Sequence, residues 1–196
     1  PSCHKQVDEA TAILAGDALL TQAFEVIADE DTHPDPRVCT DLVRALARAA
    51  GPNGMVGGQM IDLAGEGQSF DQAQVTHLHL LKTGRMFAFA CEAGAILGKA
   101  PKSIRMALRS YAHDMGLAFQ IKDDLLDVEA SSEELGKTAG KDVDQDKSTF
   151  VKLLGIDQAR DQSEMLCDQA INHLGCFDDE AEPLRAVARF VVERGR

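Results

Sequence analysis

Residues 119–127 read Phe-Gln-Ile-Lys-Asp-Asp-Leu-Leu-Asp, and they stand in a longer apolar segment with helical spacing. At the helical advance of about 100° per residue, Gln120, Asp123, Asp124 and Asp127 fall on one face of the predicted helix. Three carboxylates on one face repel each other at neutral pH unless a cation compensates them. Their oxygens suit Mg²⁺, which keeps several waters and shares itself with phosphate oxygens. The stretch therefore predicts a helix with a magnesium site, and a solvated acidic helix end is the alternative.

The remainder of the chain is also predicted to be helical. Aromatic residues make up only 5% of it, Trp is absent, and no run of alternating Val, Ile and Thr indicates a strand. Without an internal repeat or a low-complexity linker, residues 1–196 are predicted to form a single all-α domain. The expected helices cover residues 5–29, 36–50, 53–65, 70–98, 101–129, 149–153, 157–175 and 181–194, with breaks at Pro and Gly clusters.

Three local patterns refine this prediction. Gly54 and Gly58 stand four residues apart on an apolar segment, so two helices are expected to approach closely there. Ser69 and Gln72 have the spacing of a capping box at the start of the helix predicted over 70–98. His77 and His79 are two residues apart and fall on different helix faces, so they are not expected to bind a metal as a pair.

The composition excludes several classes of function. A net charge of −12 disfavours nucleic acid or an anionic membrane as a partner, because both need clustered Lys and Arg. The sequence contains no run of 18 apolar residues, so no membrane span is predicted. Five irregularly spaced cysteines predict neither a disulfide framework nor a zinc site, which favours a cytoplasmic location.

Other segments accompany the aspartate-rich helix in a fixed order. They are Gly57-Gly58-Gln59-Met60-Ile61-Asp62, Lys82-Thr83-Gly84, Gly136-Lys137 and Lys147-Ser148-Thr149. With these segments, the chain resembles the trans-isoprenyl diphosphate synthases, specifically the bacterial farnesyl/geranylgeranyl diphosphate synthase group, from Pro1 to its C-terminus. This resemblance implies an isoprenoid synthase helical bundle around a central cavity. It identifies residues 123–127 with the family's second aspartate-rich motif.

The resemblance also implies the chemistry. A short-chain prenyltransferase of this family condenses an allylic diphosphate with isopentenyl diphosphate, depends on Mg²⁺, and is generally a homodimer. Farnesyl diphosphate is the expected product, although the residues that set product length are expected upstream of Pro1. Asp123, Asp124 and Asp127 are the metal ligands that the resemblance implies.

Further residues receive roles from the same resemblance. Lys82 would hold the allylic diphosphate, while Thr83 and Gln120 would present oxygen dipoles to the nascent cation. On its own, Lys82 also fits a surface lysine that extends its head to solvent. Lys137 and Lys147 would reach bound diphosphate from a closing loop, for which a solvated charged loop is the alternative. Gln59 and Asp62 would line the same cavity as supporting partners.

One departure from the family pattern shapes the functional expectation. The family's first aspartate-rich motif and the arginine pair after it would precede Pro1, so we expect the chain to be the C-terminal portion of a synthase. Expressed alone, these residues are expected to be inactive and poorly soluble. The alternatives are a terpene cyclase and a non-catalytic partner subunit, which keeps the fold without that motif.

Overall fold

The structure is a computed structural model, and it describes residues 1–135 and 148–195. All regular elements in these two ranges are helical, which confirms the predicted all-α class. The chain divides into two compact units, residues 1–46 and 47–196, each described here by itself. The single domain expected from the sequence stays a prediction.

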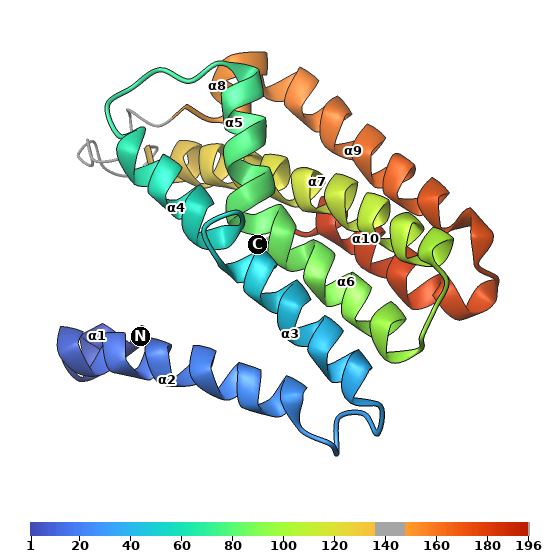
Figure 1. The fold of residues 1–196 in the computed structure, drawn as a ribbon. Coiled ribbons are helices and arrows are strands. Elements are labelled where there is room, and N and C mark those ends of the chain that lie inside the picture. Colours follow the sequence, from blue (N-terminus) through green and yellow to red (C-terminus); the bar gives the residue numbers. More distant parts are fainter. Residues whose placement is uncertain (136–147, 196) are drawn as a thin grey trace. The chain divides into compact units, whose positions relative to one another are not determined.

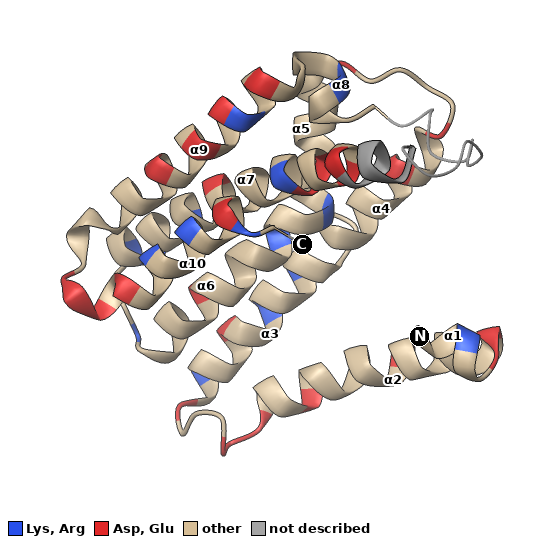
Figure 2. Cartoon of the chain, turned by 180° about the vertical axis from the view of Figure 1, so that it is seen from behind, with Lys and Arg blue, Asp and Glu red and all other residues tan. Residues whose placement is uncertain are grey.

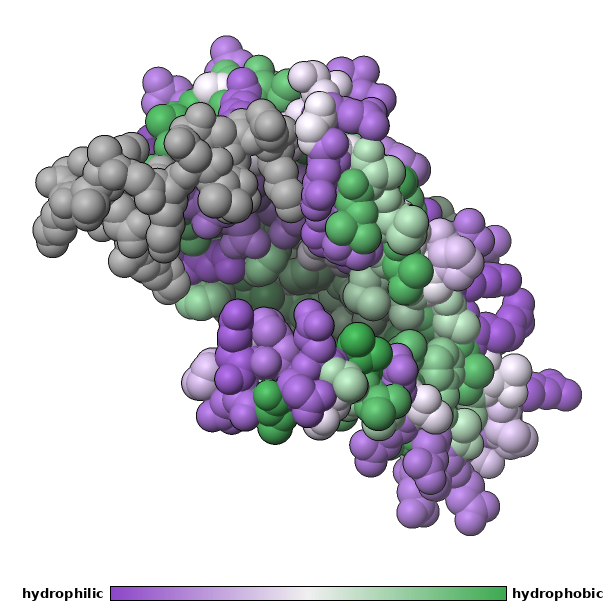
Figure 3. Space-filling model, turned by 90° about the vertical axis from the view of Figure 1, so that its left-hand side faces the viewer, coloured by the Kyte–Doolittle hydropathy of each residue, from purple (hydrophilic) through white to green (hydrophobic). Residues whose placement is uncertain are grey.

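The first unit contains a long helix without a buried residue. It consists of α1 (Cys3–Gln6), α2 (Glu9–Ala28) and most of α3 (Pro36–Ala50), whose last turn belongs to the second unit. Asp8 caps α2, because its carboxylate accepts the backbone N–H of Thr11 at 2.9 Å. Apolar side chains of α2 such as Ile13 and Leu20 are exposed, and Figure 3 shows hydrophobic side chains at the molecular surface among hydrophilic ones.

Helix α2 also qualifies the expectation of no membrane span. Within the described residues it is the one helix long and apolar enough to cross a membrane by length and hydropathy alone. Its apolar positions are interrupted by Asp17 and Glu25, which is why no unbroken apolar run appears in the sequence.

The second unit is arranged around one long helix, α7 (Lys102–Leu135). In Figure 1, α6 lies along one side of α7, and α9 and α10 lie along others. The remaining described elements of this unit are α4 (Met55–Ala64), α5 (Gln72–His79), η1 (Leu80–Gly84), α6 (Arg85–Leu97), α8 (Phe150–Leu154), α9 (Ile156–His173), η2 (Leu174–Cys176), η3 (Asp179–Ala181) and α10 (Glu182–Glu193).

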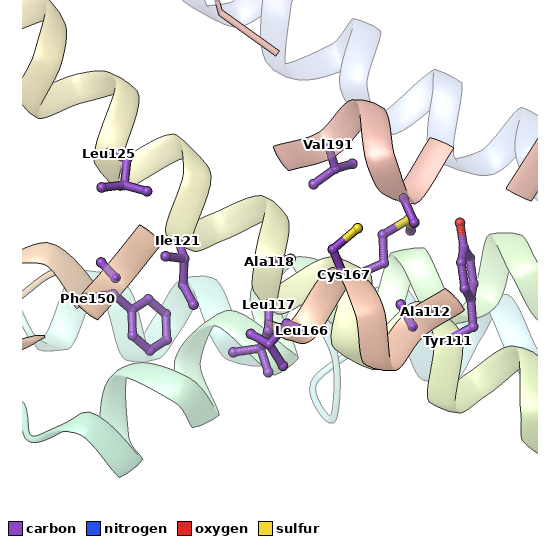
Figure 4. Packing of buried hydrophobic residues seen from close by; sticks show 14 of the residues in the cluster. Tyr111, Ala112, Leu117, Ala118, Ile121, Leu125, Phe150, Leu166, Cys167 and Val191 are labelled. Carbon is purple, nitrogen blue, oxygen red and sulfur yellow. The ribbon is translucent and has the colours of Figure 1, made fainter. Parts of the chain in front are cut away.

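The core of this unit follows the buried face of α7. Most buried apolar residues of α7 recur at intervals of three or four positions, and the full set is wider than one narrow stripe: Leu108, Tyr111, Ala112, Met115, Leu117, Ala118, Ile121 and Leu125. The fully buried ring of Phe150, from α8, packs beside Ile121 and Leu125 (Figure 4). This packing fixes the register of α7, and it therefore decides which of its residues face solvent.

Several predicted boundaries differ from the structure. The helix expected over residues 5–29 is divided at residues 7–8 into α1 and α2. Helix α7 continues to Leu135, six residues beyond the expected end, because residues 130–135 contain no Gly or Pro to stop it. The helix predicted over 70–98 is interrupted by η1, a π-helical turn. The predicted capping box at Ser69 and Gln72 is wrong, since the box forms at Asp71 and Gln74, whose bonds measure 2.8 and 2.9 Å.

The close approach predicted at Gly58 is confirmed. A Cβ atom placed on Gly58 would lie 2.3 Å from the backbone nitrogen of Lys82 and 2.6 Å from its Cα. Such distances are far inside van der Waals contact, so only glycine lets α4 approach η1 this closely. The contact seats α4 against the turn that carries Lys82 and Thr83.

Candidate diphosphate and metal site

The π-helical turn η1 carries the lysine and threonine singled out in the sequence. A π turn inserts one extra residue into a helix and is frequent at functional sites. Lys82 Nζ donates a hydrogen bond to Asp62 Oδ2 at 2.6 Å, which joins η1 to α4. The Lys82 side chain remains 34% exposed, so its ammonium group is held at the edge of the core and in reach of solvent. Gln59 lies one turn before Asp62 on α4 and is half-buried.

A line of side-chain hydrogen bonds runs from η1 to the aspartate-rich face of α7. The Thr83 hydroxyl donates to Gln120 Oε1 at 3.3 Å, and Gln120 Nε2 donates to Asp123 Oδ2 at 3.4 Å. Thr83 and Gln120 are 37 positions apart, so only the packing of η1 on α7 brings them together. Four residues predicted for the site, Lys82, Thr83, Gln120 and Asp123, therefore lie on two adjoining elements.

Asp123 has a second partner that the sequence did not indicate. The guanidinium of Arg194, just after α10, forms an ion pair with Asp123 and donates to the Phe119 carbonyl at 3.3 Å. The same guanidinium lies over the Phe119 ring, 4.1 Å from its centroid, a cation–π contact. Burial raises the pKa of Asp123, and the charge of Arg194 opposes that rise. No local motif marks Arg194, because only the tertiary fold returns it to α7.

Asp124 and Asp127 have different surroundings. Asp124 Oδ2 accepts the backbone N–H of Phe150 at 2.7 Å, and burial raises the pKa of this carboxyl to about 6. Asp127 is exposed. Figure 2 shows acidic residues, coloured red, gathered on the ribbon toward the C-terminal end of α7. The helix face predicted from the sequence thus exists, but its carboxylates differ in burial and partner.

The fit of these residues to Mg²⁺ rests on their chemistry. Carboxylate oxygens are the ligands that Mg²⁺ prefers. The raised pKa values of Asp123 and Asp124 show that their charged forms are penalised as they stand, a penalty that a cation would relieve. In residues 1–135 and 148–195, no group of three or more His, Cys, Asp or Glu side chains is already gathered as an ion site. Asp123 would have to exchange Arg194 for the ion.

One further residue of this region was dismissed by the sequence analysis. His79, the last residue of α5, is half-buried, and its ring stacks on Phe150 with 5.6 Å between the ring centroids. Burial lowers the pKa of His79, and a hydrogen bond with the Gln120 side chain opposes this. The sequence signal that could have placed His79 near the site is its position one helical turn before Lys82.

Two residues predicted for the site, Lys137 and Lys147, lie outside the residues that the structure describes.

Comparison with known proteins identifies the family. Residues 1–184 match the family model described as polyprenyl synthetase. The chain is 39% identical over 195 residues to the farnesyl diphosphate synthase of Geobacillus stearothermophilus, covering 99% of this chain and 66% of the relative. The chain therefore belongs to the polyprenyl synthetase family, and it spans just under two thirds of the length of that relative.

Solved structures agree with this assignment. An FPP/GFPP synthase from Zymomonas mobilis is 48% identical, with a TM-score of 0.87 over 97% of this chain and 64% of the other. A geranyltransferase from Helicobacter pylori, solved in complex with magnesium and isoprenyl diphosphate, is 30% identical, with a TM-score of 0.80 over 98% of this chain and 62% of the other. The described helices are thus those of an isoprenyl diphosphate synthase fold.

Proposed function

We propose that the protein carrying this chain is a short-chain prenyltransferase that joins an allylic diphosphate to isopentenyl diphosphate. The observation that carries the proposal is the hydrogen-bonded line from Thr83 through Gln120 to Asp123, with the Lys82 ammonium beside it. It places a cation and neutral dipoles next to a carboxylate-rich helix face. Farnesyl diphosphate is the proposed product, in keeping with the names of the relatives, and a cytoplasmic homodimer is the proposed form.

The proposed roles follow from charge and hydrogen-bonding capacity. Lys82 would bind the diphosphate of the allylic substrate, a charge-assisted contact that Asp62 orients beforehand. Asp123, Asp124 and Asp127 would hold Mg²⁺, which supplies electrophilic assistance to the departure of diphosphate. The oxygens of Thr83 and Gln120 would stabilise positive charge developing on the allylic carbon. Lys137, Lys147, Gln59 and the pairing of Asp62 with Lys82 would complete diphosphate binding.

An assay of prenyl transfer tests this function. The protein that carries this chain is incubated with labelled isopentenyl diphosphate and with allylic diphosphates of increasing length, in the presence of Mg²⁺ or EDTA. We expect chain elongation that requires Mg²⁺ and ends at farnesyl diphosphate. Consumption of an allylic diphosphate without isopentenyl diphosphate would indicate a terpene cyclase instead. No turnover without a second protein would indicate a partner subunit.

The Lys82→Ala variant tests the proposed diphosphate contact. Loss of a charge-assisted hydrogen bond costs roughly 1.5–3 kcal/mol, so kcat/KM for the allylic substrate should fall by about ten- to a hundredfold. Lys102→Ala, at the exposed start of α7, is the control and should leave kcat/KM unchanged. Equal kcat/KM values for the two variants would show that Lys82 is a surface lysine without a role in binding the allylic substrate.

A further inference from the structure

The start of helix α8 is held by three kinds of contact. The Ser148 hydroxyl accepts the backbone N–H of Phe70, 78 positions earlier in the sequence, at 2.9 Å. The Thr149 side chain caps the helix by accepting a backbone N–H of its first turn. The Phe150 ring is fully buried, and it stacks on the half-buried imidazole of His79 with 5.6 Å between the ring centroids. The position of the backbone at the first residue of α8 is therefore fixed by capping and packing together.

The backbone N–H of Phe150 is bound by a carboxylate. Phe150 is the first residue of α8, so its N–H has no acceptor inside the helix. Asp124 Oδ2 accepts it at 2.7 Å, the short end of the range for an N–H···O bond, as expected for a charged acceptor. A neutral acceptor such as an Asn side chain would satisfy this N–H without the cost of keeping a carboxylate half-buried. The carboxylate therefore serves a purpose other than capping α8.

Phe150 holds both the backbone and the side chain of the turn that carries Asp124. Its ring packs beside Ile121 and Leu125 of α7, which flank Asp124 in the sequence (Figure 4). Its N–H engages Oδ2, which restricts rotation of the carboxylate. A carboxylate that binds a metal ion is commonly oriented by such a hydrogen bond, and loss of the outer partner costs about ten- to a hundredfold in metal affinity.

We propose that Phe150 is a positioning residue of the metal site, because its buried ring fixes a backbone N–H that orients the Asp124 carboxylate toward the ion. The effect on metal affinity rests on the proposed function, in which Asp124 binds Mg²⁺. The hydrogen bond itself does not depend on that function.

Two substitutions separate the N–H of Phe150 from its ring. Phe150→Leu removes the ring and keeps the N–H. Phe150→Pro removes both. Proline is tolerated at the first position of a helix, and Thr149 already has the extended backbone, with ψ of 161°, that a residue before proline prefers. Both variants lack the ring, so a difference between them reports on the N–H.

The first measurement is the affinity for Mn²⁺, a cation that suits carboxylate ligands as Mg²⁺ does, in the presence of inorganic diphosphate. Titration followed by EPR should show Phe150→Pro binding Mn²⁺ about tenfold more weakly than Phe150→Leu. In the Asp124→Ala background the two variants should bind Mn²⁺ equally, because no carboxylate remains for the N–H to orient. Equal affinities with Asp124 intact, or an unchanged difference in the Asp124→Ala background, would overturn the proposal.

The dependence of prenyl transfer on Mg²⁺ is the second measurement. Phe150→Pro should need about tenfold more Mg²⁺ than Phe150→Leu for half-maximal turnover, and the two should have the same kcat when Mg²⁺ is saturating. A deficit of Phe150→Pro that persists at saturating Mg²⁺ would assign the effect to the core and would contradict a role in positioning the ligand.

NMR of the metal-free protein tests the hydrogen bond directly and covers a Phe150→Pro protein that does not fold. In protein labelled with ¹⁵N-phenylalanine, the assigned Phe150 amide proton should resonate downfield and exchange slowly with solvent. Asp124→Ala should move it upfield and speed its exchange. An amide unaffected by Asp124→Ala would sink the proposal. The expected NMR and Mn²⁺ results without prenyl transfer would instead reject the proposed function alone.

Discussion

At the scale of single residues, Asp124 is held in a state that suits a metal ligand and not a surface carboxylate. It is half-buried and accepts one backbone N–H, from Phe150. Its pKa is raised to about 6, mainly by burial and also by repulsion from Asp127 and Asp123, while the hydrogen bond from Phe150 opposes the rise. Part of the folding free energy is therefore given up to keep this carboxylate where a cation is expected.

The raised pKa of Asp124 predicts a dependence of stability on pH. Between about pH 4 and pH 6 the folded protein retains a proton that the unfolded chain has released, so the free energy of unfolding falls as the pH rises through this window. Asp124→Asn removes the titrating group, and its amide oxygen still accepts the Phe150 N–H. In the absence of metal, the variant should be more stable at pH 7 by on the order of 2 kcal/mol. Urea unfolding across pH 4–7.5 measures this difference. The same pH dependence in both proteins would contradict it.

At the scale of elements, the pairing of α4 with η1 organises the site. The π turn places Lys82 and Thr83 where they reach α4 and α7 respectively. Gly58 permits the approach, since its Cα lies against the Lys82 backbone. Backbone contact of this kind leaves no flexible side chain that could yield to an added methyl group.

Gly58→Ala should consequently force α4 away from η1. We expect a loss of about 1–3 kcal/mol in the free energy of unfolding, the range for overpacked sites, together with weaker allylic-substrate binding as the Lys82–Asp62 pair is displaced. Gly94→Ala is the matched control, because a Cβ atom there meets nothing within 4 Å and the position lies inside α6. That control should be neutral or slightly stabilising. Chemical denaturation of both variants decides the matter, and equal stabilities would disprove the close contact.

At the scale of the whole molecule, contacts between distant parts of the sequence complete the site. Arg194 and Asp123 are 71 positions apart, and their ion pair joins the end of α10 to α7. Because Arg194 occupies the same carboxylate that Mg²⁺ is proposed to bind, the two cations would compete for it. We therefore predict that Arg194, near the end of the described residues, lowers the metal affinity of the site.

Arg194→Ala should expose this competition. Without metal, the variant should melt at a lower temperature, because Asp123 loses its ion pair and Phe119 its stacked cation. Adding Mg²⁺ with inorganic diphosphate should then raise the melting temperature more than in the unsubstituted protein. A thermal-shift titration compares the two, with Arg160→Ala, in an exposed ion pair with Glu129, as the control. A smaller Mg²⁺ response in Arg194→Ala would show that Arg194 assists the site.

The exposed apolar side chains of α2 lead to a prediction about association. Ile13 and Leu20 are seven residues apart and share one helix face, with exposed fractions of 64% and 46%. We expect the isolated chain to associate with increasing concentration, and Ile13→Gln with Leu20→Gln to suppress much of that association. Met165→Gln, which changes one exposed methionine on α9, should not. Static light scattering over a concentration series measures this, and a chain that stays monomeric at all concentrations would refute it.

The sequence by itself determined the helical class and the aspartate-bearing face of α7. Both depend on local periodicity and on the scarcity of strand-forming patterns, which a single helix expresses without its neighbours. It also indicated the close approach at Gly58, because a small residue at helical spacing has a direct steric meaning. The order of motifs then pointed to the polyprenyl synthetase family.

Only the tertiary structure decided which partners those residues meet. The hydrogen bond of Gln120 with Thr83 and the ion pair of Arg194 with Asp123 join positions tens of residues apart. Their formation depends on how α5, η1 and α10 pack on α7, and no local pattern encodes that packing. The π turn likewise depends on tertiary contacts, because intrinsic helix propensity is weak beside the free energy of burial.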